Sequence, residues 1–152
     1  MNPNAANEYL KAKVLTATPE QLQLMLYDGA IRFAEKGRAA LEAKKYDDSY
    51  TNIGRAEKIL LELHCGLKPQ LAPELCKNLG GLYMYCYRKL VEANMRRDAE
   101  ALDSALSILR YQRETWVLLM QKLSQAKAGA VAAKLTMPAP DSRMEQSIRL
   151  SA

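Results

Sequence analysis

The chain has 152 residues, which suffices for one domain and leaves no room for a second substantial one. Its 49% hydrophobic and 26% charged residues are typical of a globular protein and exclude a fully disordered or collagen-like chain. One histidine and three cysteines leave little material for a metal site or for acid–base catalysis near neutral pH. We therefore expect a binding protein without enzymatic activity, cofactor or metal.

The net charge of +5 is spread along the sequence. The basic doublets at 44–45 and 96–97 fall where helices are expected to end, where cations complement the helix dipole, so no nucleic-acid partner is predicted. The sequence shows neither an apolar run that could span a membrane nor a signal peptide. Cys65, Cys76 and Cys86 lie within apolar patterns and indicate reduced core thiols of a cytoplasmic protein; zinc would need His64 as a fourth ligand, at unsuitable spacing.

Residues 1–18 form an N-terminal arm, either a short helix or an extended segment. Thr18, Pro19 and Gln21 then form a predicted capping box that starts a helix over about 19–44. A short break with acidic caps is predicted at 46–49, and the second helix follows it and runs to about 64. Further helices are predicted over about 73–97 and 98–127, with Gly66 as a C-terminal cap of the second helix and Asp98 as an N-cap of the fourth. The short connections predict an all-α, antiparallel up-down-up-down four-helix bundle over residues 19–127.

Residues 128–152 lose the helical period and predict a mostly disordered, flexible tail, with a weak helical turn near 144–150. The predicted inner stripes of the four helices consist of small and apolar residues at helical spacing. They are Leu22, Met25, Leu26, Gly29, Phe33, Gly37 and Ala40; Ile53, Ala56, Leu60 and Leu63; Leu75, Leu79, Leu82, Cys86, Leu90 and Ala93; and Leu102, Ala105, Leu106, Leu109, Trp116, Met120 and Leu123.

Three of the helices carry a second apolar stripe, which a core alone does not require. It consists of Leu24, Tyr27 and Ile31; Met84, Tyr87, Val91 and Met95; and Tyr111 and Leu118. These residues either widen the core, lie under the arm or tail, or form a groove that accepts helices of a partner. Their Met, Tyr and Leu content favours the groove.

His64 could serve as the phosphoacceptor of a histidine phosphotransfer bundle. Its helical phase instead places it toward the inner face at a helix end, which favours a partly buried structural residue. The sequence lacks a phosphate-binding loop, a nucleophile elbow and the paired Glu-x-x-His motifs of a di-iron bundle. A phosphotransfer module and an adaptor for another amphipathic-helix partner remain the alternatives.

The sequence contains several motifs in a defined order: Tyr9, the runs VLTATPEQL at 14–22 and MLYDGA at 25–30, the run LYMY at 82–85 and the run RKLVEAN at 88–94. Together they resemble the motifs of the flagellar secretion chaperones of the FliS type. The resemblance spans residues 8–116. Met84 departs from it, because the family often has Asp there, and Arg88 and Asn94 match motif positions whose role could be structural.

The resemblance implies a bundle with an N-terminal capping segment that binds the disordered C-terminal region of flagellin in the cytoplasm. It also implies prevention of premature polymerisation and delivery to an export-gate component of the flagellar type III secretion apparatus. Tyr9, Leu10 and Val14 become candidates for a plug or clamp over the groove. Two exposed grooves would also permit a weak homodimer at high concentration.

Overall fold

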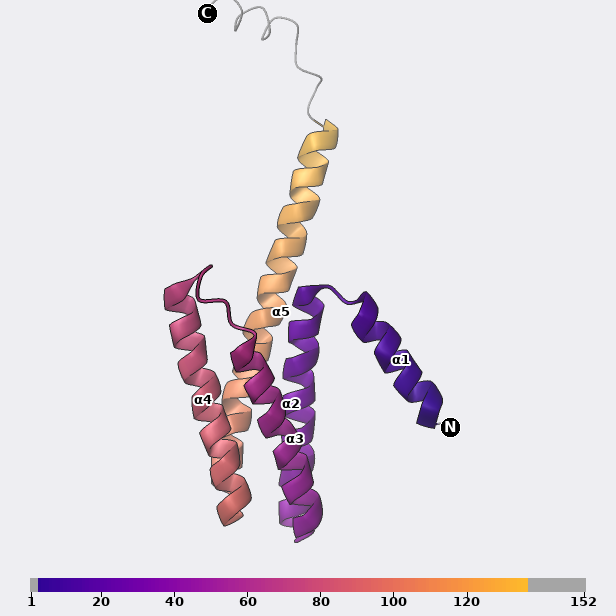
Figure 1. The fold of residues 1–152 in the computed structure, drawn as a ribbon. Coiled ribbons are helices and arrows are strands. Elements are labelled where there is room, and N and C mark those ends of the chain that lie inside the picture. Colours follow the sequence, from indigo (N-terminus) through magenta and orange to yellow (C-terminus); the bar gives the residue numbers. More distant parts are fainter. Residues whose placement is uncertain (1–2, 137–152) are drawn as a thin grey trace, which may run out of the picture. The chain divides into compact units, whose positions relative to one another are not determined.

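The computed structural model describes residues 3–136, which form five helices joined by short connections (Figure 1). The helices are α1 (Pro3–Thr16), α2 (Pro19–Glu42), α3 (Tyr46–Cys65), α4 (Pro73–Arg96) and α5 (Ala99–Thr136). No described residue forms a strand, and none of these helices is long and apolar enough to cross a membrane. The all-α class is therefore confirmed, and the N-terminal arm is helical in its described part.

The chain divides into two compact units, the first ending at Val117 and the second beginning at Leu118. α1 to α4 and the first part of α5 belong to the first unit. The remainder of α5 belongs to the second unit, which is described separately below. The predicted division into an arm, a bundle and a tail follows other boundaries and stays a prediction.

The starts of α2 and α5 follow the local sequence closely, whereas α3 begins at Tyr46, inside the segment predicted as a break, and its N-cap residue Lys45 makes no side-chain cap. At the start of α2, the Gln21 backbone N–H donates to Thr18 Oγ1 over 3.2 Å, and the Thr18 N–H donates to Gln21 Oε1 over 3.0 Å. This is the predicted capping box. At the start of α5, Asp98 Oδ1 accepts from the backbone N–H groups of Glu100 and Ala101, so Asp98 is the expected N-cap.

Three ion pairs between α2 and α5 show that the two helices are antiparallel, because the residue numbers rise along one helix as they fall along the other. The pairs are Asp28 with Arg113, Glu35 with Arg110 at 2.9 Å, and Arg38 with Asp103 at 2.9 Å. All three lie at exposed or half-exposed positions, so they fix register more than they add stability.

Contacts between the other neighbouring helices indicate that their chain directions also alternate. α3 and α4 meet where the Asn94 side chain donates to the Tyr50 carbonyl, and again where Gly80 lies beside His64. α2 and α3 meet where Gly37 lies against Ile53. Within the first unit, these contacts are compatible with the predicted up-down-up-down order of α2, α3, α4 and the first part of α5 (Figure 1).

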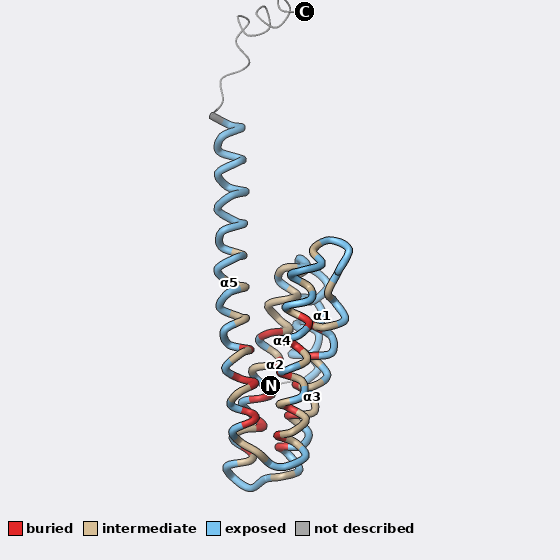
Figure 2. The backbone as a smooth tube through the Cα atoms, turned by 90° about the vertical axis from the view of Figure 1, so that its left-hand side faces the viewer, coloured by how far each residue is buried: buried red, intermediate tan, exposed pale blue. Residues whose placement is uncertain are grey.

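The core draws on all four bundle helices and is continuous along the first unit (Figure 2). Its buried members are Tyr27, Ala30, Ala34, Ile53, Ala56, Leu60, Leu63, Tyr83, Cys86, Leu90, Ala93, Ala101, Leu102, Ala105, Leu106 and Leu109. The predicted inner stripe of α3 is fully confirmed, as is that of α5 up to Leu109. Trp116 is partly buried against the same cluster, and its indole N–H donates to the Glu20 carbonyl over 2.9 Å.

The predicted core faces of α2 and α4 are partly wrong. α2 buries small residues together with Tyr27, while Leu22 and Met25 stay half-buried. In the first turns of α4, Leu75 and Leu82 are exposed, and Tyr83 is buried in place of Leu82. The sequence pattern favoured a stripe of large aliphatic side chains, whereas the packed faces of both helices bury small residues together with one tyrosine, Tyr27 on α2 and Tyr83 on α4.

Two further predictions need correction. Only Cys86 is a core thiol; Cys65 is exposed and Cys76 is half-buried. Burial raises the pKa of the Cys86 thiol to about 12, which keeps it protonated and unreactive at neutral pH.

The last helix does not end near Lys127 but continues to Thr136, and the predicted turn near 144–150 lies outside the described residues. Alanine and lysine between 126 and 134 have high helix propensity, which outweighs the loss of apolar period.

Candidate functional site

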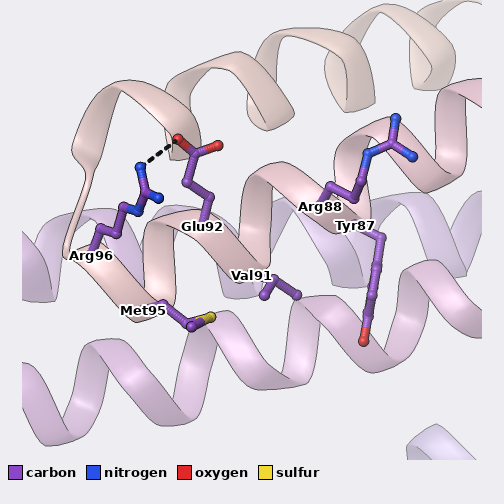
Figure 3. A pocket seen from close by; sticks show the side chains of 6 residues that line it. All are labelled: Tyr87, Arg88, Val91, Glu92, Met95 and Arg96. Atoms are coloured by element: carbon purple, nitrogen blue, oxygen red, sulfur yellow. Dashed lines mark ion pairs between the residues drawn. The ribbon is translucent and has the colours of Figure 1, made fainter.

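Three apolar residues of α4 line one face of the helix. Tyr87, Val91 and Met95 follow one another at four-residue spacing, so their side chains lie one above the other. Tyr87 and Val91 are half-buried, and Met95 is 80% exposed. Figure 3 shows these three side chains on one side of α4, with the charged side chains of Arg88 and Glu92 extending from the other. We call Tyr87, Val91 and Met95 the α4 stripe.

The α4 stripe lines an open depression of about 410 Å³, together with Arg88, Glu92 and Arg96. Glu92 pairs with Lys89 at 3.3 Å and, more loosely, with Arg96 at 4.0 Å. No described residue forms an ion pair with Arg88. The depression is therefore lined by apolar side chains and by the guanidinium group of Arg88, which is not part of these ion pairs.

A second depression, of about 610 Å³, continues the first one between α4 and α3. Tyr87 lines both depressions, and from α3 the second is lined by Tyr50, Gly54 and Leu61, among others. Tyr50 is 69% exposed and Leu61 is 40% exposed. A Cβ atom added at Gly54 would meet no atom within 4 Å, so the space beside this part of α3 is open.

Sequence reasoning missed the contribution of α3. Tyr50, Gly54 and Leu61 are spaced so that they share one helix face beside the buried residues of α3, and this spacing could have revealed them. Two isolated apolar residues among charged ones did not form a visible stripe. Only the packing of α3 beside α4 makes them part of one surface.

Asn94 and Glu57 join the two helices at this surface. The Asn94 side-chain amide donates to the Tyr50 carbonyl over 3.2 Å and to Glu57 Oε1 over 3.5 Å. Partial burial raises the pKa of Glu57, and the hydrogen bond from Asn94 opposes that shift. The role of Asn94 in this structure is to hold α4 against α3.

Tyr27 does not belong to an exposed groove, which corrects the sequence-based assignment. Its side chain is 2% exposed, and its hydroxyl lies 2.5 Å from that of Tyr83, which accepts a further hydrogen bond from Gln23 Nε2 over 3.2 Å. Burial raises the pKa of Tyr83, with its hydrogen bond to Tyr27 acting in the same direction. These two tyrosines form a buried polar contact between α2 and α4.

The remaining predicted groove residues are not gathered into the same surface. Leu24, Ile31 and Met84 are half-buried, and Ile31 packs against the core. Tyr111 is 67% exposed on α5. Leu118 is 58% exposed and belongs to the second unit. Of the nine predicted positions, the structure brings the three residues of the α4 stripe into one depression.

The proposed plug residues lie on α1, which buries none of its residues. Tyr9 is 68% exposed, Leu10 48% and Val14 45%. Leu10 and Val14 line an apolar depression of about 510 Å³ on this helix, with Leu15 beside them. α1 therefore presents an apolar face of its own, and its role as a plug or clamp stays a prediction.

His64 is half-buried near the end of α3, beside Gly80 of α4. A Cβ atom at Gly80 would lie 3.6 Å from His64 Nε2, so the imidazole packs against the α4 backbone. This placement agrees with a structural helix-end histidine. Among the described residues, no group of three or more His, Cys, Asp or Glu side chains could hold a metal ion.

The chain is similar to a defined group of known proteins. The family model described as flagellar protein FliS matches residues 1–123. The flagellar secretion chaperone FliS of Bacillus subtilis (strain 168) is 32% identical over 129 residues, which cover 85% of this chain and 94% of that protein. The namesake from Salmonella typhimurium is 32% identical over 116 residues, covering 76% of this chain and 86% of that protein.

A solved structure described as a flagellar chaperone from bacteria superposes with a TM-score of 0.65 at 20% identity. The match covers 78% of this chain and 97% of that one, which supports the helical fold. The fold is an all-helical one that carries an exposed apolar stripe on α4, and the matching proteins are secretion chaperones. The chain belongs to the FliS family of flagellar secretion chaperones and is not an enzyme, which confirms the resemblance found in its motifs.

Proposed function

We propose that the chain binds the disordered C-terminal region of flagellin in the cytoplasm, prevents its premature polymerisation and delivers it to the flagellar type III export gate. Family membership supports a role in flagellar secretion. Flagellin and the export gate as partners come from the resemblance described above. The observation that carries the proposal is the α4 stripe, an exposed apolar surface that continues onto α3.

The physical basis of client binding is burial of this surface. Covering apolar surface contributes roughly 25 cal/mol per Å², and the side chain of Met95 is largely available for it. A disordered client that folds as a helix on the bundle would place apolar residues, spaced three or four apart, against the α4 stripe. Such coupled folding costs ordering entropy, which suits a client that must later be released.

Sequestration follows from the same contacts. A client segment held on the bundle cannot engage other flagellin molecules, so polymerisation is blocked while the complex persists. Release requires no nucleotide in this proposal, because competition for the client at the export gate would suffice. The exposed residues Tyr9, Leu10 and Val14 of α1 would clamp the bound segment or cover the stripe before binding.

Calorimetric titration of the full chain with a flagellin C-terminal peptide tests the proposal. Val91→Asp places a charge in the middle of the stripe, and we expect binding to weaken on the order of tenfold or more. Met95→Asp should act in the same direction with little effect on folding, because this residue is 80% exposed. The matched control is Leu71→Asp, at an equally exposed leucine of the loop before α4, which should leave affinity unchanged.

Circular dichroism must show that the variants remain folded. Unchanged affinity in folded Val91→Asp and Met95→Asp would refute the α4 stripe as the client site. Tyr27→Asp is unsuitable for this purpose, because a charge at that buried position would unfold the bundle. Failure of Val91→Asp to reduce flagellin export in cells, despite weaker binding, would contradict the delivery step.

Sedimentation of the free chain at rising concentration tests the proposed weak homodimer.

A further inference from the structure

The second unit contains a helical segment that lies largely outside the family match. α5 continues to Thr136, whereas the match to the family model ends at residue 123. Most residues of this segment are exposed (Figure 2), and its large apolar residues include Leu119 at 44%, Leu123 at 43% and Val131 at 56% exposure. An isolated helix of this length is marginal in water, so a helix with exposed leucines gains stability when a partner covers it.

One face of this segment has the spacing of a coiled-coil seam. Leu119, Leu123, Ala126, Ala130 and Ala133 alternate at intervals of four and three residues. This alternation averages 3.5 residues, the period that keeps one apolar line facing a partner helix. We call these five residues the α5 seam. Its leucines provide apolar area at one end, and its alanines permit close approach of a second helix at the other.

The charges beside the α5 seam all have one sign. Lys122 flanks it on one side, and Lys127 and Lys134 flank it on the other, at positions equivalent to g and e of a heptad. Residues 118–136 contain no Asp or Glu. The three lysines are exposed, and within the described part of the chain none of them forms an ion pair. In coiled coils, charges at these flanking positions select the partner.

We propose that the α5 seam is a second docking surface, which pairs with an amphipathic helix of another protein that carries acidic residues beside its own apolar line. This surface is separate from the α4 stripe, and the inference does not depend on flagellin binding. Each flanking lysine would face a carboxylate of the partner helix. Such a helix would neutralise the lysines and cover Leu119 and Leu123 at the same time.

Charge and side-chain size favour an acidic partner helix over a second copy of the chain and over an anionic membrane. A second copy of the chain would bring lysines opposite lysines, which destabilises the pair. An anionic membrane would attract the lysines, but three seam positions are alanines, which bury little apolar area in a lipid interface. Residues 118–136 also contain no aromatic side chain to anchor in such an interface. Small seam residues instead suit close helix–helix packing.

The test uses the full chain and a labelled synthetic helix of three heptads, with Leu at the seam positions and Glu at the flanking ones. Repulsion between glutamates keeps this probe from pairing with itself. A second probe carries Lys in place of Glu. Fluorescence anisotropy at low salt should show binding of the acidic probe at least about tenfold tighter than that of the basic one. Added salt should reduce the difference.

The triple variant Lys122→Glu, Lys127→Glu, Lys134→Glu should invert the preference between the two probes. The matched control, Lys45→Glu, Lys68→Glu, Lys77→Glu, makes the same change in net charge at exposed positions of the first unit and should keep the original preference. Leu123→Asp should weaken binding of the acidic probe in the otherwise unchanged chain. These three results together support the proposal.

Equal inversion by the control variant would overturn it, since net charge alone would then explain the binding. Absence of binding to the acidic probe would overturn it as well. So would self-association of the chain in sedimentation that Leu123→Asp abolishes, because a second copy would then occupy the seam. Tighter binding to vesicles of phosphatidylglycerol and phosphatidylcholine than to the acidic probe would assign the surface to a membrane instead.

Discussion

α2 and α4 are helices of equal length that differ in whether a tyrosine of the second apolar stripe is buried. Each has 24 residues and begins with a proline in its first turn. Each also carries a tyrosine that the sequence pattern places outside the core. In α2 that tyrosine, Tyr27, is 2% exposed and lies in the core, whereas in α4 Tyr87 stays half-buried and lines two surface depressions.

Small residues explain the difference. α2 buries Ala30, Ala34 and Gly37 on the face that includes Tyr27, and Gly37 lies directly against Ile53 of α3. Close approach along this face draws Tyr27 inward, where its hydroxyl meets that of Tyr83. On α4 the buried face consists of Gly80, Tyr83, Cys86, Leu90 and Ala93, and Tyr87 and Val91 lie half-buried beside it. A second apolar stripe therefore forms an exposed surface only where the orientation of the helix in the bundle leaves that stripe outside the core.

The largest effect should separate the two tyrosines directly. Tyr27→Ala should lower the free energy of unfolding by about 3–5 kcal/mol, because it empties a core position and leaves the Tyr83 hydroxyl without one of its partners. Tyr87→Ala should cost only about 1 kcal/mol, as a half-buried surface position. Urea denaturation monitored by circular dichroism measures both. Equal losses would show that the two helices do not differ in the way described.

A pair of glycines tests the close packing of α2. A Cβ atom at Gly37 would lie 2.6 Å from Ile53 Cγ1, so Gly37→Ala should destabilise the bundle by about 1–3 kcal/mol. Gly54 is the matched control on α3, because a Cβ atom there meets no atom within 4 Å. Gly54→Ala should stabilise the protein by about 0.5–1 kcal/mol through helix propensity. Thermal denaturation would contradict the packing argument if both substitutions changed stability in the same direction.

The smallest effect concerns Glu57 at the junction of α3 and α4. Its pKa is raised in the folded state, so the native protein binds its proton more tightly than the unfolded chain does. Stability should therefore fall slightly as pH rises from the ordinary value of 4.5 through the raised one. Glu57→Gln should remove this loss, so the variant should be slightly more stable than the unchanged protein at pH 7 and gain nothing below pH 4.5.

Denaturation of Glu57→Gln at several pH values checks this expectation. The control is Glu62→Gln, at an exposed position of the same helix. A decrease in stability at pH 7 in Glu57→Gln alone would show that the carboxylate, rather than its neutral isostere, is needed at the hydrogen bond from Asn94.

Several elements could be predicted from single residues. The capping box at Thr18 and the N-cap at Asp98 appear as expected, because caps depend on hydrogen bonds within one turn. The buried residues of α3 were also predicted, since Ile53, Leu60 and Leu63 form a single stripe without competitors. The end of α5 was not, because an alanine-rich helix needs no apolar period to persist.

The candidate site likewise contains residues that the sequence predicted and residues that it did not. Tyr87, Val91 and Met95 were predicted because four-residue spacing within one helix is visible in the sequence. Tyr50 and Leu61 were not predicted: their shared face is visible in the sequence, but only the packing of α4 beside α3 makes them part of the same surface.

The sequence by itself determined the bundle helices, the starts of α2, α4 and α5, the α-helical class and, through its motifs, the family of this protein, because these features depend on local hydrogen bonds and on residue order. Only the tertiary structure decided which residues α2 and α4 bury. Helix rotation is set by the fit of small residues such as Gly37 against a neighbour such as Ile53, and that fit exists only between helices distant in the sequence.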